Sequence, residues 1–187
     1  MTDRREHIAD AGITLLATRG VRALTHRAID EELGLPAGST SYYARTKHDL
    51  LNLIVQRLST RTGADAASYQ LPSNPTPEST ALLMVGALDM LMRREDDHRA
   101  RLLLLMECHN DPVFSEVLAA RPPIRLDFTE MAAELFRRLN VSDPERNARD
   151  AVGLLDGMLM QRIIRGAHPN EQAIFAAYLR GLPKVTR

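Results

Sequence analysis

The sequence predicts an all-α protein with two domains, about nine helices in total. An N-terminal three-helix helix-turn-helix domain is expected over residues 1–46, and a larger C-terminal helical domain over residues 47–187. Three observations support this prediction. Apolar residues recur at helical spacing along almost the whole chain, and no stretch of any length alternates like a strand. Glycine and proline punctuate the helical segments. Finally, the turn GLPAG, residues 34–38, is short enough to force one helix across the next.

Local signals mark both ends of the helix that precedes this turn. Thr25 is a suitable N-cap, and Leu24 can pack on Ile29 as a hydrophobic staple. Gly34 stands where a left-handed residue ends a helix. The polar side chains of the segment are expected to face solvent, namely Arg27, Asp30, Glu31 and Glu32.

The helix after the turn, residues 36–44, has hydroxyl and aromatic side chains but almost no large aliphatic ones. Such a helix cannot be a core helix and is expected to face a polar partner. Thr46 and Asp49 then form a capping box, and Lys47 lies beside the exposed N–H groups of a new helix. Amides and an ammonium together make a seat for a phosphate. The pattern therefore indicates a DNA-binding helix-turn-helix, with a chance match as the alternative.

This stretch also resembles a known family. The N-terminal helix, the pattern TxRxI beginning at Thr25 and the string GLPAGSTSYYxxTKxDLL resemble the DNA-binding domain of the tetracycline-repressor (TetR) family of bacterial transcription regulators. In that family the recognition helix commonly ends in Tyr, His and Phe before a Ser/Asn-Lys pair. This chain keeps Tyr42 and Lys47 in register, but it has Tyr43 where His is usual and Ala44 where Phe is usual.

The resemblance implies a dimeric, ligand-responsive transcription regulator that binds double-stranded operator DNA and an unidentified small-molecule effector. The residues expected to contact DNA are Thr25, Arg27, Ser39, Thr40, Tyr42, Tyr43 and Lys47. Tyr42 and Lys47 would bind phosphates, whereas Ser39, Thr40 and Tyr43 would face base edges, with a phosphate as the alternative for Tyr43. Repression is the family default, and an activator would have the same sequence features.

Capping signals and periodic apolar residues define the other helices. They are expected near residues 4–19, 47–62, 77–92, 97–109, 124–139, 144–165 and 170–181, with a shorter piece before Pro122. Thr76 and Asp143 are the expected caps of two of them, each followed by proline at the first helical position. The acidic residues from Glu95 to Asp97, with His98, are expected to be a solvated helix start.

The helix over residues 144–165 is apolar on two sides, so each of these two faces is expected to pack against a neighbour. Gly153 and Gly157, four apart, allow a second helix to approach closely. With the last helix it could form a four-helix dimer interface, which the family resemblance favours, although packing inside one subunit also accounts for the pattern. The expected interface residues are Val152, Leu155, Leu159, Ile163, Phe175, Tyr178 and Leu179.

Methionines are frequent on the helices of the second domain, where they could line an adaptable ligand pocket, with ordinary core filling as the alternative. Polar groups on the same helices could orient a ligand. The candidate pocket residues are Met84, Met106, Glu107, His109, Met131, Met158 and Arg162.

Two other kinds of chemistry are disfavoured. Glu107, Cys108, His109 and Asp111 include metal-ligand types, but neighbours on a helix point about 100° apart and rarely bind one ion. No metal site and no cofactor is therefore expected. Motifs such as GxSxG, HExxH and CxxC are absent from the sequence, so enzymatic activity has no support.

Charge and composition set further bounds. The chain has 24 basic and 24 acidic residues, so any DNA affinity must come from the placement of charge. It has no apolar run of about 18 residues and no signal-peptide pattern, so we expect a cytoplasmic protein with no membrane partner. Cys108 is the only cysteine, which excludes an intrachain disulfide. The rival function is a helical small-molecule-binding protein or enzyme in which the helix-turn-helix is only scaffold.

Overall fold

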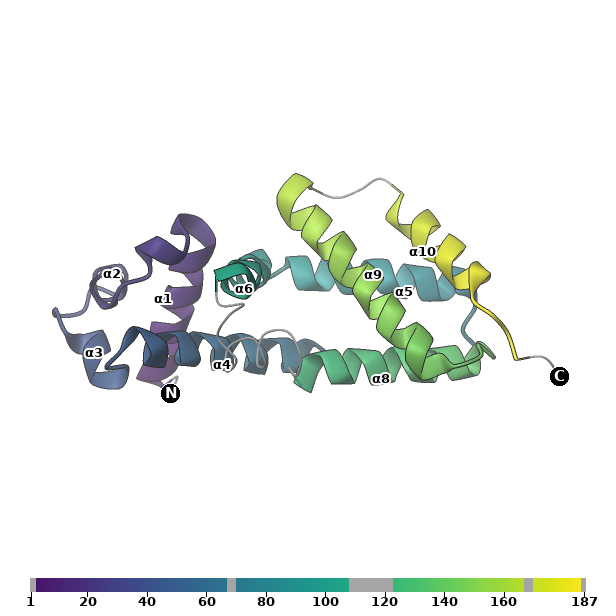
Figure 1. Cartoon of the computed structure of the whole chain (residues 1–187), viewed down its shortest axis with the longest axis horizontal. Helices are drawn as coiled ribbons and strands as arrows, with labels where there is room; N and C mark the ends of the chain where they lie inside the picture. Colours follow the sequence, from purple (N-terminus) through teal and green to yellow (C-terminus); the bar gives the residue numbers. More distant parts are fainter. Residues whose placement is uncertain (1–2, 67–69, 108–122, 167–169, 186–187) are drawn as a thin grey trace. The chain divides into compact units, whose positions relative to one another are not determined.

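The structure, a computed structural model, describes residues 3–66, 70–107, 123–166 and 170–185, and these residues are all-helical. Apart from an isolated bridge between Val141 and Lys184, the described residues contain no strand. The helices, drawn in Figure 1, are α1 (Arg4–Arg19), η1 (Val21–Ala23, a 3-10 helix), α2 (His26–Glu32), α3 (Ser39–Tyr43), α4 (Lys47–Ala66), α5 (Pro77–Met92), α6 (Glu95–Glu107), α8 (Pro123–Arg138), α9 (Pro144–Arg165) and α10 (Glu171–Gly181). The predicted fold class is confirmed.

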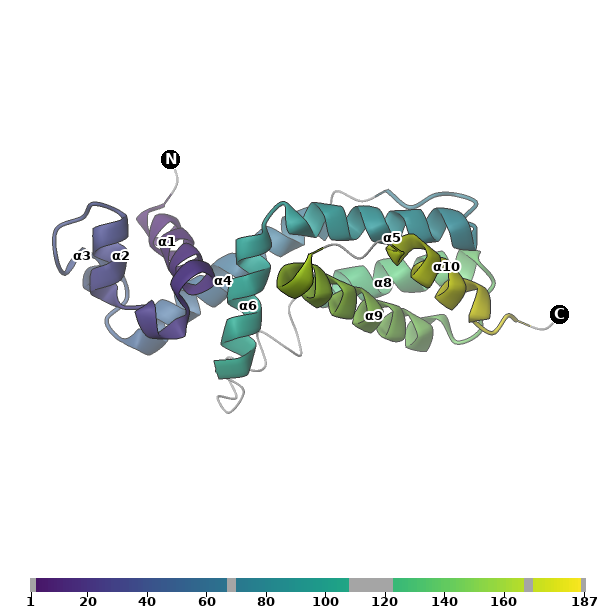
Figure 2. The same cartoon turned by 90° about the horizontal axis from the view of Figure 1, so that it is seen from above.

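The helices form two compact units. The N-terminal unit comprises Met1–Gly63 and Glu95–Pro122, and the C-terminal unit comprises Ala64–Arg94 and Pro123–Arg187. The helix α4 begins in the first unit and ends in the second. The helix α6 lies against α1 within the N-terminal unit, as both views show (Figures 1 and 2), although the sequence assigned it to the C-terminal domain.

The core of the N-terminal unit explains why α6 belongs there. Ala100 and Leu104 of α6 are fully buried in one cluster with side chains from α1 and α4, including Leu16 and Ile54. At Gly12 of α1, an added Cβ would stand 2.5 Å from Cδ1 of Ile54. Glycine at this position therefore lets α1 and α4 approach closely.

Ion pairs hold the same helices together beside this core. Arg57 of α4 donates from Nε to Oδ1 of Asp10 at 2.8 Å, and Arg61 is 2.7 Å from the same carboxylate. Arg61 also donates to Oδ1 of Asp97 at 2.9 Å. Asp97 and its neighbour His98 are buried, so the prediction of a solvated start to α6 was wrong. The paired arginine allows a carboxylate to be buried there.

The C-terminal unit is built from α5, α8, α9 and α10, with α8 against α9 and α5 against α10. Its largest fully buried side chains include Phe136, Phe175 and Leu88. The predicted N-cap of α5 is confirmed, since Thr76 and Ser79 form a reciprocal capping box. At the start of α9, Asp143 occupies the cap position with φ of 48° but makes no side-chain capping bond.

Candidate DNA-binding surface and ligand cavity

A buried carboxylate fixes the two helices of the helix-turn-helix to each other. Asp30 of α2, only 2% exposed, accepts hydrogen bonds from the backbone N–H groups of Gly38 and Thr40, each at 2.8 Å. It also accepts a bond from the Thr40 hydroxyl at 2.6 Å. The expectation that Asp30 faces solvent was wrong. Three hydrogen-bond donors from the turn and from α3 take the place of the water that would otherwise solvate its carboxylate. This side chain therefore helps to fix the orientation of α3 on α2.

Charge is retained at this buried position. Loss of solvent on burial would by itself raise the pKa of Asp30. The hydrogen bonds from the side chain and backbone of Thr40 and from the backbone of Gly38, with the nearby His26, outweigh that effect, so the pKa of Asp30 lies below its usual value. The carboxylate is thus held ionised, in the form that accepts all three bonds.

The same geometry corrects one predicted base contact. Thr40 is 0% exposed, and its hydroxyl is committed to Asp30. Its side chain therefore has a structural role and cannot face a base edge. One signal for this role is present in the sequence: Thr40 directly follows a tight turn, where the next helix must pack against the previous one.

The other predicted DNA contacts lie on or beside the exposed side of α2 and α3. Tyr42 is 82% exposed, and its ring meets that of Tyr43 edge to face, with centroids 5.1 Å apart. Tyr43 is half-buried and packs against the core of the N-terminal unit. Ser39 is half-buried, and its hydroxyl donates to the Pro36 carbonyl at 2.6 Å. Tyr42 is thus the largest side chain that α3 offers to a partner.

Two predicted residues mark the start of α2. The Thr25 hydroxyl accepts a hydrogen bond from the Ala28 N–H at 3.1 Å, which confirms it as an N-cap. Arg27 is exposed and pairs with Glu31 at 2.8 Å. A contact that sequence reasoning missed is the 2.8 Å hydrogen bond between His26 Nε2 and the carbonyl of Ala44, which ties the end of α3 back to α2.

The predicted phosphate seat has the expected cap at the start of α4. The Thr46 N–H donates to Asp49 Oδ2, and the Asp49 N–H donates to the Thr46 hydroxyl, both at 3.0 Å. Hydrogen bonding to the Asp49 carboxylate, first from the Thr46 backbone and then from its side chain, lowers the pKa of Asp49. Lys47 is exposed on the first turn of this helix. A positive side chain therefore stands at the positive end of a helix dipole, as a phosphate site requires.

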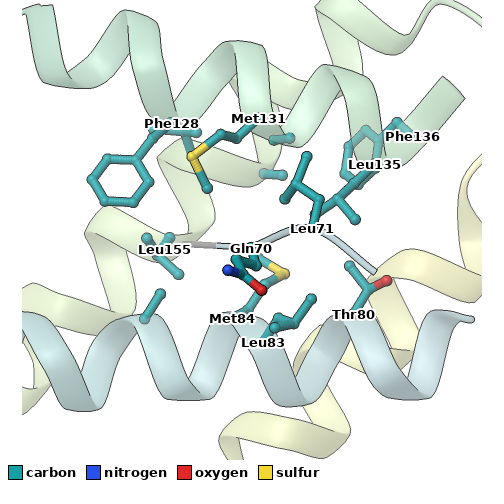
Figure 3. A pocket seen from close by; sticks show the side chains of 14 residues that line it. Gln70, Leu71, Thr80, Leu83, Met84, Phe128, Met131, Leu135, Phe136 and Leu155 are labelled. Carbon is teal, nitrogen blue, oxygen red and sulfur yellow. The ribbon is translucent and has the colours of Figure 1, made fainter. Parts of the chain in front are cut away.

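The C-terminal unit has an apolar cavity of about 80 Å³ between α5, α8 and α9, and it is partly open to solvent. Two of the predicted pocket residues, Met84 and Met131, line it, and Figure 3 shows them projecting from α5 and α8. The full lining is Gln70, Leu71, Thr80, Leu83, Met84, Ala87, Phe128, Met131, Ala132, Leu135, Phe136, Ala151, Val152 and Leu155. A water needs about 10–15 Å³ on this measure, so the cavity has room for a small apolar group.

The other predicted pocket residues do not line this cavity. Met106 and Glu107 are exposed on α6 in the N-terminal unit, and His109 lies outside the described residues. Met158 borders a separate hollow between α9 and α10. Helical spacing in the sequence could not show which helix faces converge on the cavity, or that α6 belongs to the N-terminal unit.

Arg162 has a different role from the predicted one. It is buried, it donates from Nε to Glu171 at 2.8 Å and pairs with the same carboxylate through Nη2, and its Nη1 reaches Asp89 at 2.7 Å. The hydrogen bonds that Arg162 donates to Glu171, above all, raise the pKa of Arg162. The arginine therefore joins α9 to α10 and α5 as an internal ion pair, and it is not among the residues that line the cavity.

The predicted interface residues are mostly core residues of one chain. The fully or nearly fully buried members are Val152, Leu155, Leu159, Phe175 and Leu179, while Ile163 and Tyr178 are half-buried against the same core. The five buried side chains pack inside their own chain, which corrects their assignment to an interface. For Ile163 and Tyr178 the interface stays a prediction. On the opposite face, Met160 and Ile164 are exposed, and Gly153 and Gly157 border a hollow.

The described residues contain neither a cluster of potential metal ligands nor a helix that could span a membrane. No group of three or more His, Cys, Asp or Glu side chains among the described residues is placed to hold an ion. Cys108, His109 and Asp111 lie outside those residues. Over the same part of the chain, every helix is too short or too polar to cross a membrane.

An exposed, tyrosine-bearing α3 locked onto α2, together with an apolar cavity in a separate helical unit, is the arrangement of a helix-turn-helix transcription regulator. The profile of the family described as "Tetracyclin repressor-like, C-terminal domain" matches residues 75–184. The chain belongs to the TetR family of transcriptional regulators. Members of this family are regulators and not enzymes, in agreement with the sequence-based prediction.

Solved structures share the fold over nearly the whole chain. A TetR-family regulator from Rhodococcus sp. is 16% identical, with a TM-score of 0.73 over 97% of this chain and 99% of its own. A TetR-family member from Streptomyces coelicolor A3 is 20% identical, with a TM-score of 0.70 over 95% and 99% of the two chains. The multidrug binding protein EbrR in complex with malachite green is 24% identical, with a TM-score of 0.72 over 97% and 99%. No curated protein sequence matches the chain.

Proposed function

We propose that this chain is a homodimeric repressor of the cytoplasm that binds operator DNA and leaves it when a small-molecule effector binds. The observation that carries the proposal is the lock between Asp30 and Thr40, which holds α3 to α2 while Tyr42 stays 82% exposed. A helix that served only as scaffold would bury its large side chains. An exposed aromatic residue on a rigidly held helix is suited to a partner.

Residues 1–46 are proposed as the DNA-binding domain, and residues 47–187 as the domain for effector binding and dimerisation. Lys47 and Tyr42 are exposed and would bind phosphates. Tyr43 and Ser39 are half-buried and would reach a base or phosphate at the rim of the groove. Thr25 and Arg27 at the start of α2 would contact the adjacent backbone, as their exposure permits.

Dimerisation is proposed on the outer face of α9 and α10. The hollow there is bordered by Gly153, Leu154, Gly157, Met158, Gln161 and Ile174, and Met160 and Ile164 of α9 are exposed. Glycines four residues apart leave a groove on a helix that a neighbouring helix can enter, and exposed apolar side chains gain from being covered. Two copies paired here would present two recognition helices to one pseudo-palindromic operator.

Effector-driven release is proposed from the cavity of the C-terminal unit. Its wall is almost entirely apolar, so it suits burial of an apolar small molecule. EbrR, which has the same fold, was crystallised with malachite green and is a multidrug binding protein. Because α4 runs from Lys47 to Ala66, beyond the point where the two units divide, a shift at its end would be carried along one helix. Binding at the two sites would then be coupled reciprocally.

Footprinting of the DNA upstream of the chain's own gene tests the proposal. We expect a protected pseudo-palindrome with half-sites roughly 34–36 Å apart, or at a wider spacing along the same face of the duplex. Analytical ultracentrifugation of the complex should give two chains per operator. If no sequence is protected at any protein concentration below the one at which the chain coats DNA non-specifically, the scaffold function is favoured instead.

A further inference from the structure

Arg45 lies in the short connection between α3 and α4 (Figure 1), and side chains hold both of the peptide groups that flank it. The peptide group before Arg45 contains the carbonyl of Ala44, which lies 2.8 Å from Nε2 of His26. A carbonyl oxygen can only accept, so the His26 ring donates this bond. The peptide group after Arg45 contains the N–H of Thr46, which donates to Oδ2 of Asp49 at 3.0 Å. Because peptide groups are planar, holding both of them also fixes the direction in which the Arg45 side chain leaves the backbone.

Uncompensated positive charge is scarce on the helix-turn-helix. Residues 25–49 contain three basic side chains and four acidic ones. Arg27 pairs with Glu31 at 2.8 Å, so its charge is largely offset. Arg45 and Lys47 are exposed, and neither forms an ion pair within the ranges that the structure describes. Non-specific attraction to DNA comes from Lys and Arg side chains that neutralise phosphates, so these two are the main source of attraction that this stretch offers.

The position of Arg45 in the chain indicates which part of the DNA it meets. In a helix-turn-helix, the N-terminal residues of the recognition helix contact base edges. Arg45 follows the other end of α3, which ends at Tyr43, and a residue there approaches the rim of the groove, where the phosphates lie. A guanidinium offers two parallel N–H groups to two phosphate oxygens. Taking the proposed DNA-binding function as given, we propose that Arg45 binds a phosphate of the duplex and that His26 positions it for this contact.

The phosphate contact is tested with a short DNA duplex of arbitrary sequence, because such a contact acts on any sequence. Binding to the full-length chain is followed by fluorescence anisotropy over a range of salt concentrations. Arg45→Ala should lower the slope of log affinity against log salt by about one and weaken binding about five- to ten-fold at physiological salt. Arg45→Lys keeps the charge and should retain the slope. Arg180→Ala, which removes an exposed arginine from α10, is the control and should change neither slope nor affinity.

The positioning role of His26 is tested by its coupling to Arg45. His26→Phe keeps a ring but removes the N–H donor, whereas His26→Gln keeps a side-chain N–H donor. In the His26→Phe chain, Arg45→Ala should cost about two- to five-fold less affinity than in the wild type, because the contact is no longer ordered in advance. In the His26→Gln chain it should cost the full amount. Lys47→Ala should cost the same in all three backgrounds, because Lys47 lies on α4, beyond this hydrogen bond, whereas general unfolding would weaken both contacts.

Several results would overturn the inference. An unchanged salt slope in Arg45→Ala would remove the phosphate contact, and a loss confined to the footprinted operator would make Arg45 a base contact. An equal cost of Arg45→Ala in the wild type and in the His26→Phe chain would remove the role of His26. The proposed function fails separately: a wild-type chain that binds the arbitrary duplex but prefers no sequence would count against operator binding and leave the phosphate contact standing. A chain that binds no duplex at low salt would overturn both.

Discussion

Asp30→Ala is the substitution that tests the structural basis of the DNA-binding surface most sharply. It removes one acceptor and leaves the Gly38 N–H, the Thr40 N–H and the Thr40 hydroxyl without their partner. A hydrogen bond to a charged group contributes about 1.5–3 kcal/mol, and bonds that share one acceptor are not additive. We therefore expect a loss of about 3–5 kcal/mol in the free energy of unfolding, a large fraction of the stability of a typical domain.

Urea unfolding of the full-length chain, with helicity as the signal, measures this loss. Thr40→Val removes only the 2.6 Å hydroxyl bond and should cost about 1–2 kcal/mol. The loss of stability in the double variant should be smaller than the sum of the two single-variant losses. Glu31→Ala, a neighbouring carboxylate that is exposed, is the control and should leave the midpoint unchanged. An Asp30→Ala chain that unfolds at the wild-type urea concentration would refute the lock.

The pH dependence of Asp30 provides a second readout of the same contact. Because the pKa of Asp30 is lower in the folded protein than in the unfolded chain, its contribution to stability is fully present above the unfolded-state pKa of about 3.9. That contribution is lost as the pH falls through the folded-state pKa. The stability difference between the wild type and Asp30→Asn should therefore be constant near neutral pH and shrink below about pH 3.9. A difference that grows on acidification would contradict the assigned shift.

Three further substitutions test the remaining proposals. Lys47→Ala should weaken binding to all DNA sequences about equally and lower the slope of log affinity against log salt by about one. Arg180→Ala on α10 is the control and should leave the slope unchanged. Loss of operator preference alone would make Lys47 a base contact. Ile164→Arg places a charge on the proposed dimer face and should therefore give a folded monomer in sedimentation. Leu82→Arg is the control, because Leu82 is also an exposed large apolar residue but lies on α5, and this variant should stay dimeric. A dimeric Ile164→Arg chain would exclude that face. Arg162→Met should lose about 3–5 kcal/mol in urea unfolding because it removes the arginine that pairs with the buried Glu171. A loss no greater than that of the exposed Arg180→Met would contradict the buried ion pair.

Features with a purely local cause could be predicted from the sequence. The capping box between Thr46 and Asp49 and the cap at Thr76 depend on residues three apart in the chain, and the structure has both. Gly34 has the left-handed φ of 61° expected at the end of a helix. These signals also fixed most helix bounds, since a helix begins and ends where its own first and last turns find partners.

Features that depend on contacts between distant segments could not be predicted in this way. Asp30 stands beside two glutamates, so the helical pattern places it in solvent, and only the donors eight and ten residues later make its burial possible. Phe175 and Leu179 were predicted to lie in a dimer interface, but they are buried in the core of one chain. An apolar stripe does not say whether the same chain or a second copy covers it, and here the same chain does.

The most direct test of the central claim is the specificity of DNA binding by the intact chain. Fluorescence anisotropy should be measured on the footprinted duplex and on a shuffled duplex of the same length and composition, at matched salt. If a rigidly held α3 reads the operator, the footprinted duplex should bind at least about 10³-fold more tightly, the range that separates specific from non-specific protein–DNA complexes. Equal affinities for the two duplexes would contradict the account, because phosphate contacts alone cannot tell them apart.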